Sequence, residues 1–148
     1  MGATSDAAIR TGAAEFLHPS EDVIATLVVS VRGHQQTRAG GVAGIVGGAR
    51  AGRARKAAEG AGIELASPMA LVLTSRRLLT FETGRGGNVK AMLNELVLQE
   101  VGGLEVRRVG LGASLTLTLR DTSIALESRV GASRDFAEVL AQARAAVA

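Results

Sequence analysis

The sequence contains no cysteine, tryptophan or tyrosine, and its only aromatic residues are Phe16, Phe81 and Phe136. The lack of cysteine excludes a disulfide scaffold, thiolate metal ligands and a thiol nucleophile. The scarcity of aromatic rings argues against binding of single-stranded nucleic acid, which uses such rings as stacking platforms. A hydrophobic core must therefore be built mainly from Leu, Val, Ile and Ala.

Long apolar runs are also missing. No stretch reaches the roughly 18 residues that a membrane-spanning helix requires, and the N-terminal MGATSDAAIR lacks the apolar centre of a signal peptide. We therefore expect a cytoplasmic protein. The net charge of +3 is compatible with nucleic acid or an anionic membrane surface but requires neither, and the missing aromatic rings make nucleic acid the less favoured partner.

What is present suffices for one folded domain over residues 1–148. Hydrophobic residues form 47% of the chain, which is enough to bury a core at this length. The pattern predicts a short helix over 5–17 and a nearly continuous apolar strand over 22–31, which suggests either burial on both faces or a bent strand. A Gly/Ala/Arg-rich insertion follows at 34–67. Six further strands are predicted near 69–75, 77–83, 92–98, 102–109, 113–120 and 123–128.

Hairpins and a terminal helix complete the pattern. Ser75, Arg76 and Arg77 predict a tight polar turn between two strands. In SLTLTLR at 114–120 the leucines alternate with threonines, so we expect the leucines to face the core and the threonines to face solvent.

The last segment predicts an amphipathic helix with Ser133 as its N-cap. Asp135 is placed in the first turn of this helix, where the helix dipole favours a negative charge. An apolar stripe follows at helical spacing. It consists of Phe136, Val139, Leu140 and Ala143.

Three stretches carry a resemblance to a known family. They are LVLTSRRLLTFE at 71–82, ELVLQEVGGLEV at 95–106 and SIALESRVGASRDFAEVL at 123–140. In this order they resemble the central hairpin, the next strand pair, and the last strand with its capping helix in bacterial pleckstrin-homology-like (PH-like) domains. The resemblance covers roughly the C-terminal half, and its motifs are packing motifs rather than chemical ones.

The resemblance implies a mainly β (α+β) fold. We expect a bent seven-stranded antiparallel barrel with a short N-terminal helix. A C-terminal helix, whose Phe136 points into the barrel, caps one end. The insertion 34–67 then falls between the first and second strands, where it departs from the usual compactness of the family. Because the shared motifs are packing motifs, the resemblance implies a fold rather than an activity.

No catalytic set is visible. The two histidines, His18 and His34, are best interpreted as surface residues, because a zinc site would need more ligands at close spacing. GLGAS at 110–114 lacks the last glycine of a dinucleotide fingerprint and is interpreted as a hairpin turn, and GRGGN at 84–88 is not a P-loop. We predict no catalytic, cofactor-binding or metal-binding residue and no cofactor. We therefore do not expect the protein to be an enzyme.

The insertion contains a glycine at every fourth position, namely Gly40, Gly44, Gly48 and Gly52. In a helix these residues would share one face and let another helix approach closely. Glycine costs about 1 kcal/mol relative to alanine in a helix interior, so a partner would have to offset the cost. Three interpretations stay open: a surface loop, a helix docked on its own sheet or on another subunit, and a membrane-surface segment.

The membrane interpretation depends on the basic residues of the segment 39–56. Arg50, Arg53, Arg55 and Lys56 could contact anionic headgroups beside an apolar run. The pair Arg53 and Arg55 resembles the basic residues that follow the first strand in phosphoinositide-binding members. The leading hypothesis remains a non-enzymatic module that binds a protein partner or forms a homo-oligomer, and the alternative is peripheral attachment to an anionic membrane through 39–56.

Overall fold

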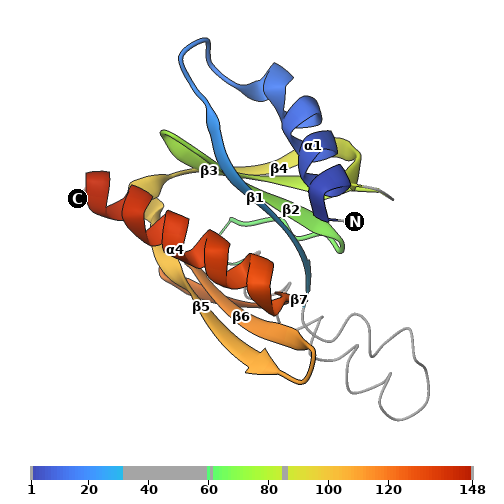
Figure 1. Cartoon of the computed structure of the whole chain (residues 1–148). Coiled ribbons are helices and arrows are strands. Elements are labelled where there is room, and N and C mark those ends of the chain that lie inside the picture. The colour runs from blue at the N-terminus through green and yellow to red at the C-terminus, as the bar shows by residue number, and fades with distance from the viewer. Residues whose placement is uncertain (1, 32–59, 61, 85–86, 148) are drawn as a thin grey trace.

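The computed structural model describes residues 2–31, 60, 62–84 and 87–147, and of residues 2–5 only the backbone. Seven strands form one antiparallel sheet in the order β4-β3-β2-β1-β7-β6-β5 (Figure 1). The strands are β1 (Val23–Val31), β2 (Met69–Thr74), β3 (Arg77–Thr83), β4 (Val89–Val97), β5 (Val101–Val109), β6 (Gly112–Leu119) and β7 (Thr122–Arg129). The helices are α1 (Gly2–Ala13), η1 (Ala14–Phe16), η3 (Leu98–Glu100) and α4 (Val130–Val147).

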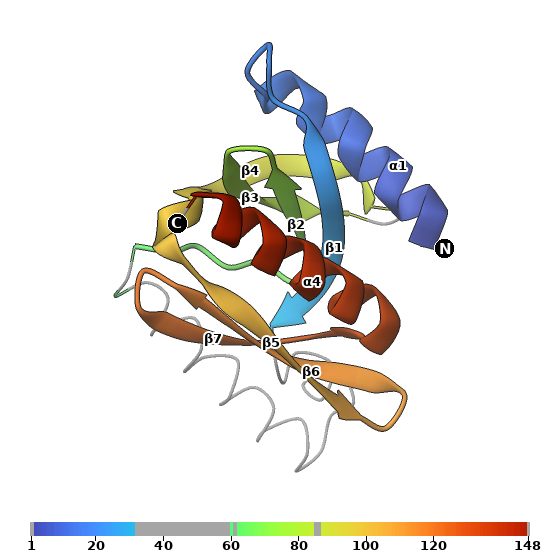
Figure 2. The ribbon, with the colours of Figure 1, turned by 60° about the vertical axis from the view of Figure 1, so that its left-hand side comes forward.

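The predicted mainly β fold is confirmed, and its arrangement is consistent with a PH-like fold. The sheet bends so that its two halves lie on either side of one core, with α4 across their open side (Figure 2). It does not close into a complete barrel. Strands β4 and β5, which η3 connects, both remain edge strands of the described sheet.

The main core lies between the half-sheets and is almost entirely aliphatic. Alternation in β6 buries Leu115, Leu117 and Leu119, as the sequence predicts, while the intervening threonines are partly exposed. From α4, Phe136 and Leu140 enter this core and are 2% and 0% exposed. The apolar stripe of the terminal helix is therefore the face that covers the sheet.

A second, smaller core lies under α1, on the outer face of the first half-sheet. Ile9 and Ala13 of α1 pack there against β2 and β3. The Phe16 and Phe81 rings meet edge to face, with their centroids 5.3 Å apart. Gly12 permits the close approach, because a Cβ at this position would lie 2.7 Å from the Val89 Cβ. The first strand contributes to both cores, but only one of its faces is fully buried, so the expectation of burial on both faces is confirmed only in part.

One local prediction is wrong, and a second is wrong in part. Ser133 is not an N-cap, because α4 begins at Val130; its buried hydroxyl donates to the Arg129 carbonyl at 2.6 Å, and Asp135 consequently lies beyond the first turn. The predicted polar turn is confirmed at Ser75 and Arg76 but does not include Arg77. Arg77 is the first residue of β3 and is 6% exposed, because an acidic partner distant in the sequence neutralises it.

Replacing Phe136 tests whether α4 is held by its aromatic anchor. Phe136→Ala should lower the free energy of unfolding by about 3–5 kcal/mol, because it leaves a cavity in a core with no other ring from this helix. Chemical denaturation followed by circular dichroism measures the change. Ala141→Gly, at an exposed position of the same helix, should cost only about 1 kcal/mol, and an unchanged midpoint for Phe136→Ala would show that α4 is not docked through this residue.

Candidate functional site

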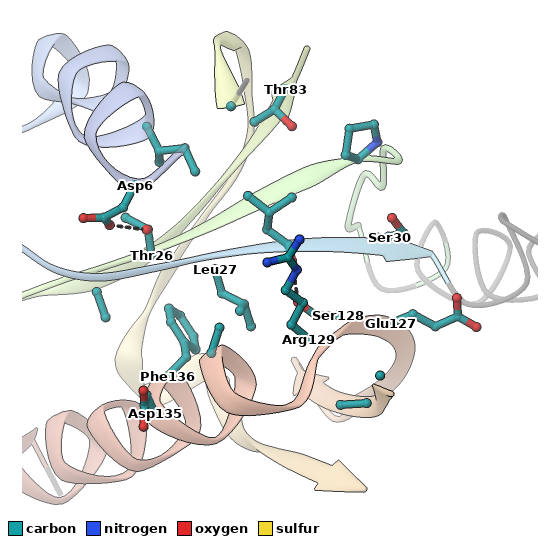
Figure 3. A pocket seen from close by; sticks show the side chains of 18 of the residues that line it. Asp6, Thr26, Leu27, Ser30, Thr83, Glu127, Ser128, Arg129, Asp135 and Phe136 are labelled. Atoms are coloured by element: carbon teal, nitrogen blue, oxygen red, sulfur yellow. Dashed lines mark hydrogen bonds between the residues drawn. The ribbon is translucent and has the colours of Figure 1, made fainter. Parts of the chain in front are cut away.

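A groove of about 1190 Å³ follows β1 between the two helices (Figure 3). The helix α1 lies on one side of the strand and α4 on the other. Residues of β7 and of the turn between β5 and β6 also line the groove. Residues around the end of β3 form a further part of the lining. The groove therefore collects segments that are far apart in the sequence.

The floor of the groove is an edge of β1 without a strand partner. One edge pairs with β2 from Val23 to Val29, whereas the other pairs with β7 only at Ser30 and Val31. From Val23 to Val29 this second edge meets no other strand in the described part of the chain, and we call it the open edge. The Val28 carbonyl on this edge accepts a hydrogen bond from Ser128 Oγ at 2.6 Å.

The direction of the Val28 carbonyl indicates which main-chain groups face the groove. In an antiparallel strand the N–H and C=O groups of alternate residues point to the same edge. The main-chain groups of Thr26 therefore point to the same edge as those of Val28. An incoming strand would find the N–H and C=O groups of Thr26 and the N–H of Val28 at this edge, while the Val28 carbonyl is already engaged by Ser128.

The α1 wall of the groove is polar and internally paired. Asp6 accepts hydrogen bonds from the Thr26 hydroxyl and from Arg10 Nε, the latter at 2.9 Å. Arg10 also donates to the Val23 carbonyl at 3.0 Å. The pairing holds α1 against the beginning of β1, and it leaves the Asp6 carboxylate engaged rather than available as a general base.

The α4 wall is more apolar. Phe136 and Val139 line it together with the exposed Ala132 and Asp135. On the β1 side of the groove, Leu27 adds to this apolar surface. Side chains that enter the groove between β1 and α4 thus meet mostly carbon.

One buried hydroxyl of the lining lacks a partner. Thr83 is 4% exposed, and its Oγ1 has no hydrogen-bond partner within the residues that the structure describes. It lies at the end of β3, on the rim shared with Gly84 and Gly87. A buried hydroxyl without a partner is unfavourable, so a polar group of a ligand that reached it would be stabilised.

The turn between β5 and β6 stands at the mouth of the groove and is apolar. Leu111 is 95% exposed and Val109 is 58% exposed, and both belong to the lining. Ile24, at the beginning of β1, is a third exposed apolar residue of the lining, at 43%. The rim therefore carries three of the larger apolar side chains that the described surface exposes.

A buried ion pair lies outside the groove. Arg77 donates from Nε and Nη2 to the two oxygens of Glu21, each at 2.8 Å, and Thr74 Oγ1 donates to the same carboxylate at 2.6 Å. The hydrogen bond from Arg77 lowers the pKa of Glu21 to about 2, against the opposing effect of burial. The same bond raises the pKa of Arg77. This pair fastens the segment after α1 to the β2–β3 hairpin and is structural.

Nothing in the described residues forms a metal centre. Across residues 2–31, 60, 62–84 and 87–147, no three His, Cys, Asp or Glu side chains gather as ligands. In the same part of the chain no helix combines the length and the apolarity needed to cross a membrane. The arrangement is suited to binding through main-chain groups and apolar contacts, and it offers no acid–base pair.

The residues predicted as interaction sites lie outside the described part of the chain. They are Gly40, Gly44, Gly48 and Gly52, with Arg50, Arg53, Arg55 and Lys56. The sequence did not point to the open edge, because strand register depends on contacts between distant residues. The signal for the apolar turn was present, since Leu111 stands in a turn where polar residues are usual.

Comparison with protein-family models and with curated proteins finds no match to this chain.

Acid titration tests the Glu21–Arg77 pair. Because the pKa of Glu21 falls from 4.5 to about 2, the ionised carboxylate stabilises the folded protein above pH 4.5, and this contribution is lost as the pH falls toward 2. Glu21→Gln should therefore lower the free energy of unfolding by about 3 kcal/mol at pH 7 and by progressively less below pH 4.5.

Urea denaturation of both proteins between pH 7 and pH 2.5 measures this difference. Glu95→Gln is the matched control, since Glu95 binds the same Arg77 at 2.8 Å but is 51% exposed. It should cost less than about 1 kcal/mol. A loss for Glu21→Gln that stayed constant with pH would contradict the assignment.

Proposed function

We propose that this protein is a non-enzymatic, PH-like binding module that takes up an extended segment of a protein partner along the open edge of β1. The observation that carries the proposal is the open edge itself, which lies in a groove between two helices. Extended peptides bind many proteins by adding a strand to such an edge, with main-chain hydrogen bonds supplying affinity.

The dimensions of the groove agree with such a ligand. At about 3.3 Å per residue, the open edge from Val23 to Val29 would accommodate a bound strand of about six residues. Thr26 and Val28 would supply the main-chain hydrogen bonds. The Thr83 hydroxyl gives the ligand one further polar partner near the end of the groove.

The two walls favour a particular ligand pattern. Successive side chains of a bound strand point to opposite faces, so alternate residues would face α1 and α4. The α1 side presents Asp6 and Arg10, whereas the α4 side presents Phe136 and Val139. We therefore expect a segment in which polar residues alternate with apolar ones and the apolar ones pack against α4.

A selection from a phage-displayed library of random dodecapeptides tests the proposal. Ala132→Arg places a long cation in the groove from an exposed position of α4, and it should weaken the selected peptides at least about tenfold. Ala141→Arg is the control, because Ala141 is exposed on the same helix outside the lining. The amides of Thr26 and Val28 should become protected from hydrogen exchange in the complex.

Two outcomes would contradict the proposal. One is the recovery of peptides that bind both arginine variants as tightly as the original protein. The other is the recovery of no peptide above background.

Assembly through the glycine-rich segment remains part of the proposed function. If Gly44 and Gly48 allow a helix to pack against a second copy, Gly44→Leu combined with Gly48→Leu should separate the helices and lower the mass in solution. Light scattering at several concentrations measures this mass. An assembly with the same mass in both proteins, or a monomer in both, would remove the segment from this role.

Attachment to an anionic membrane through residues 39–56 is the alternative function. It rests on Arg50, Arg53, Arg55 and Lys56 alone, and in that case the protein would be cytoplasmic and peripheral to the membrane.

A further inference from the structure

The turn between β5 and β6 breaks a local rule of hairpin construction. Two residues, Gly110 and Leu111, connect the strands, and Gly110 has φ of +60° while Leu111 has no positive φ. This combination matches a turn that needs glycine first and accepts many residues second. Such positions are normally polar, yet here a leucine stands 95% exposed.

The neighbouring hairpin provides an internal comparison. Between β6 and β7 the two turn residues are Arg120 and Asp121, with φ of 47° and 64°. That turn is polar, as expected for an exposed connection. The folding requirements of a tight hairpin therefore do not explain the leucine at the other end of β6.

Leu111 is part of an apolar apex with cations around it. Val109 is 58% exposed two residues earlier. Arg107 and Arg108 precede Val109 on opposite faces of β5, since Arg108 pairs with the inward-facing Ala113 and Arg107 with Ser114. Arg129 of β7 lies beside Gly112 at the same end of the sheet. All three arginines are exposed.

The acidic residues of the neighbouring strand positions lie no nearer the turn than Arg107. Glu127 is level with Arg107 across Ser114 on the outer face, and Glu105 is two pairs farther from the turn. Asp135 lies on α4, in the wall of the groove. From Val106 to Leu115 the hairpin has two arginines and no acidic side chain.

We propose that the β5–β6 turn is a membrane-docking apex, in which Leu111 and Val109 enter the interface of an anionic bilayer while Arg107, Arg108 and Arg129 contact its phosphates. An apolar group flanked by basic residues is the combination that peripheral membrane segments use. Figures 1 and 2 show this hairpin at the end of the sheet away from α1. This contact is separate from the one proposed for residues 39–56.

Vesicle co-sedimentation of the full chain tests the inference. The probes are vesicles of pure phosphatidylcholine and vesicles of equal parts phosphatidylcholine and phosphatidylserine. We expect binding to the anionic vesicles only. Leu111→Asn, which suits the turn and removes no buried contact, should weaken binding about tenfold or more, and Arg107→Gln should weaken it about fivefold.

The controls separate this site from the other surfaces. Val97→Asn alters an apolar residue that is 49% exposed on β4 and should leave vesicle binding unchanged. Ala132→Arg should weaken peptide binding at least about tenfold without reducing vesicle binding, so the proposals for the groove and for the apex can fail independently. The inference is overturned if the original protein does not bind anionic vesicles, or if Leu111→Asn binds as the original does. Loss only on changing Arg50, Arg53, Arg55 and Lys56 to Gln would also overturn it, by assigning the contact to residues 39–56.

Discussion

The architecture depends on one strand serving two half-sheets. β1 pairs with β2 along nearly its whole length and with β7 at only two residues, Ser30 and Val31. This short pairing is the sole ladder between the halves in the described sheet, so their separation must be filled by side chains and covered by α4. The open edge of β1 results from the same constraint, because a strand that turns from one half-sheet toward the other cannot pair fully with both.

The position of α1 depends on a second, electrostatic constraint. The Glu21–Arg77 pair is buried, with both side chains below 10% exposed, and Arg77 Nη2 also donates to the Phe16 carbonyl at 2.8 Å. These bonds fix the chain between the end of η1 and the beginning of β1. As a result α1 lies against the outer face of β2 and β3 and forms one wall of the groove. A charged pair far from the groove thus contributes to its shape.

Much of the fold could be predicted from the hydrophobic pattern, because β6 alternates strictly between buried and partly exposed residues, while β2 and β3 are almost continuously buried. The predicted strands agree with β2 through β7 to within three residues at every end. The sequence could not show the Glu21–Arg77 pair, since its members are 56 positions apart and each is an ordinary surface residue when considered alone. The prediction of Ser133 as an N-cap was wrong because a residue that is well suited to capping can also lie inside a helix. The open edge could not be predicted from the sequence for a similar reason, because strand register is set by contacts between distant segments.

The groove and the turn differ in what they reveal about function. Any sequence that folds in this way must leave part of β1 unpaired, so the existence of the open edge is a consequence of the fold, and only the walls contributed by α1 and α4 are specific to this chain. Leu111 is the opposite case. The turn geometry constrains Gly110, whose φ is +60°, but it would accept a polar residue at position 111 without loss of packing. An exposed leucine that the fold does not require is explained more directly by contact with an apolar medium than by stability.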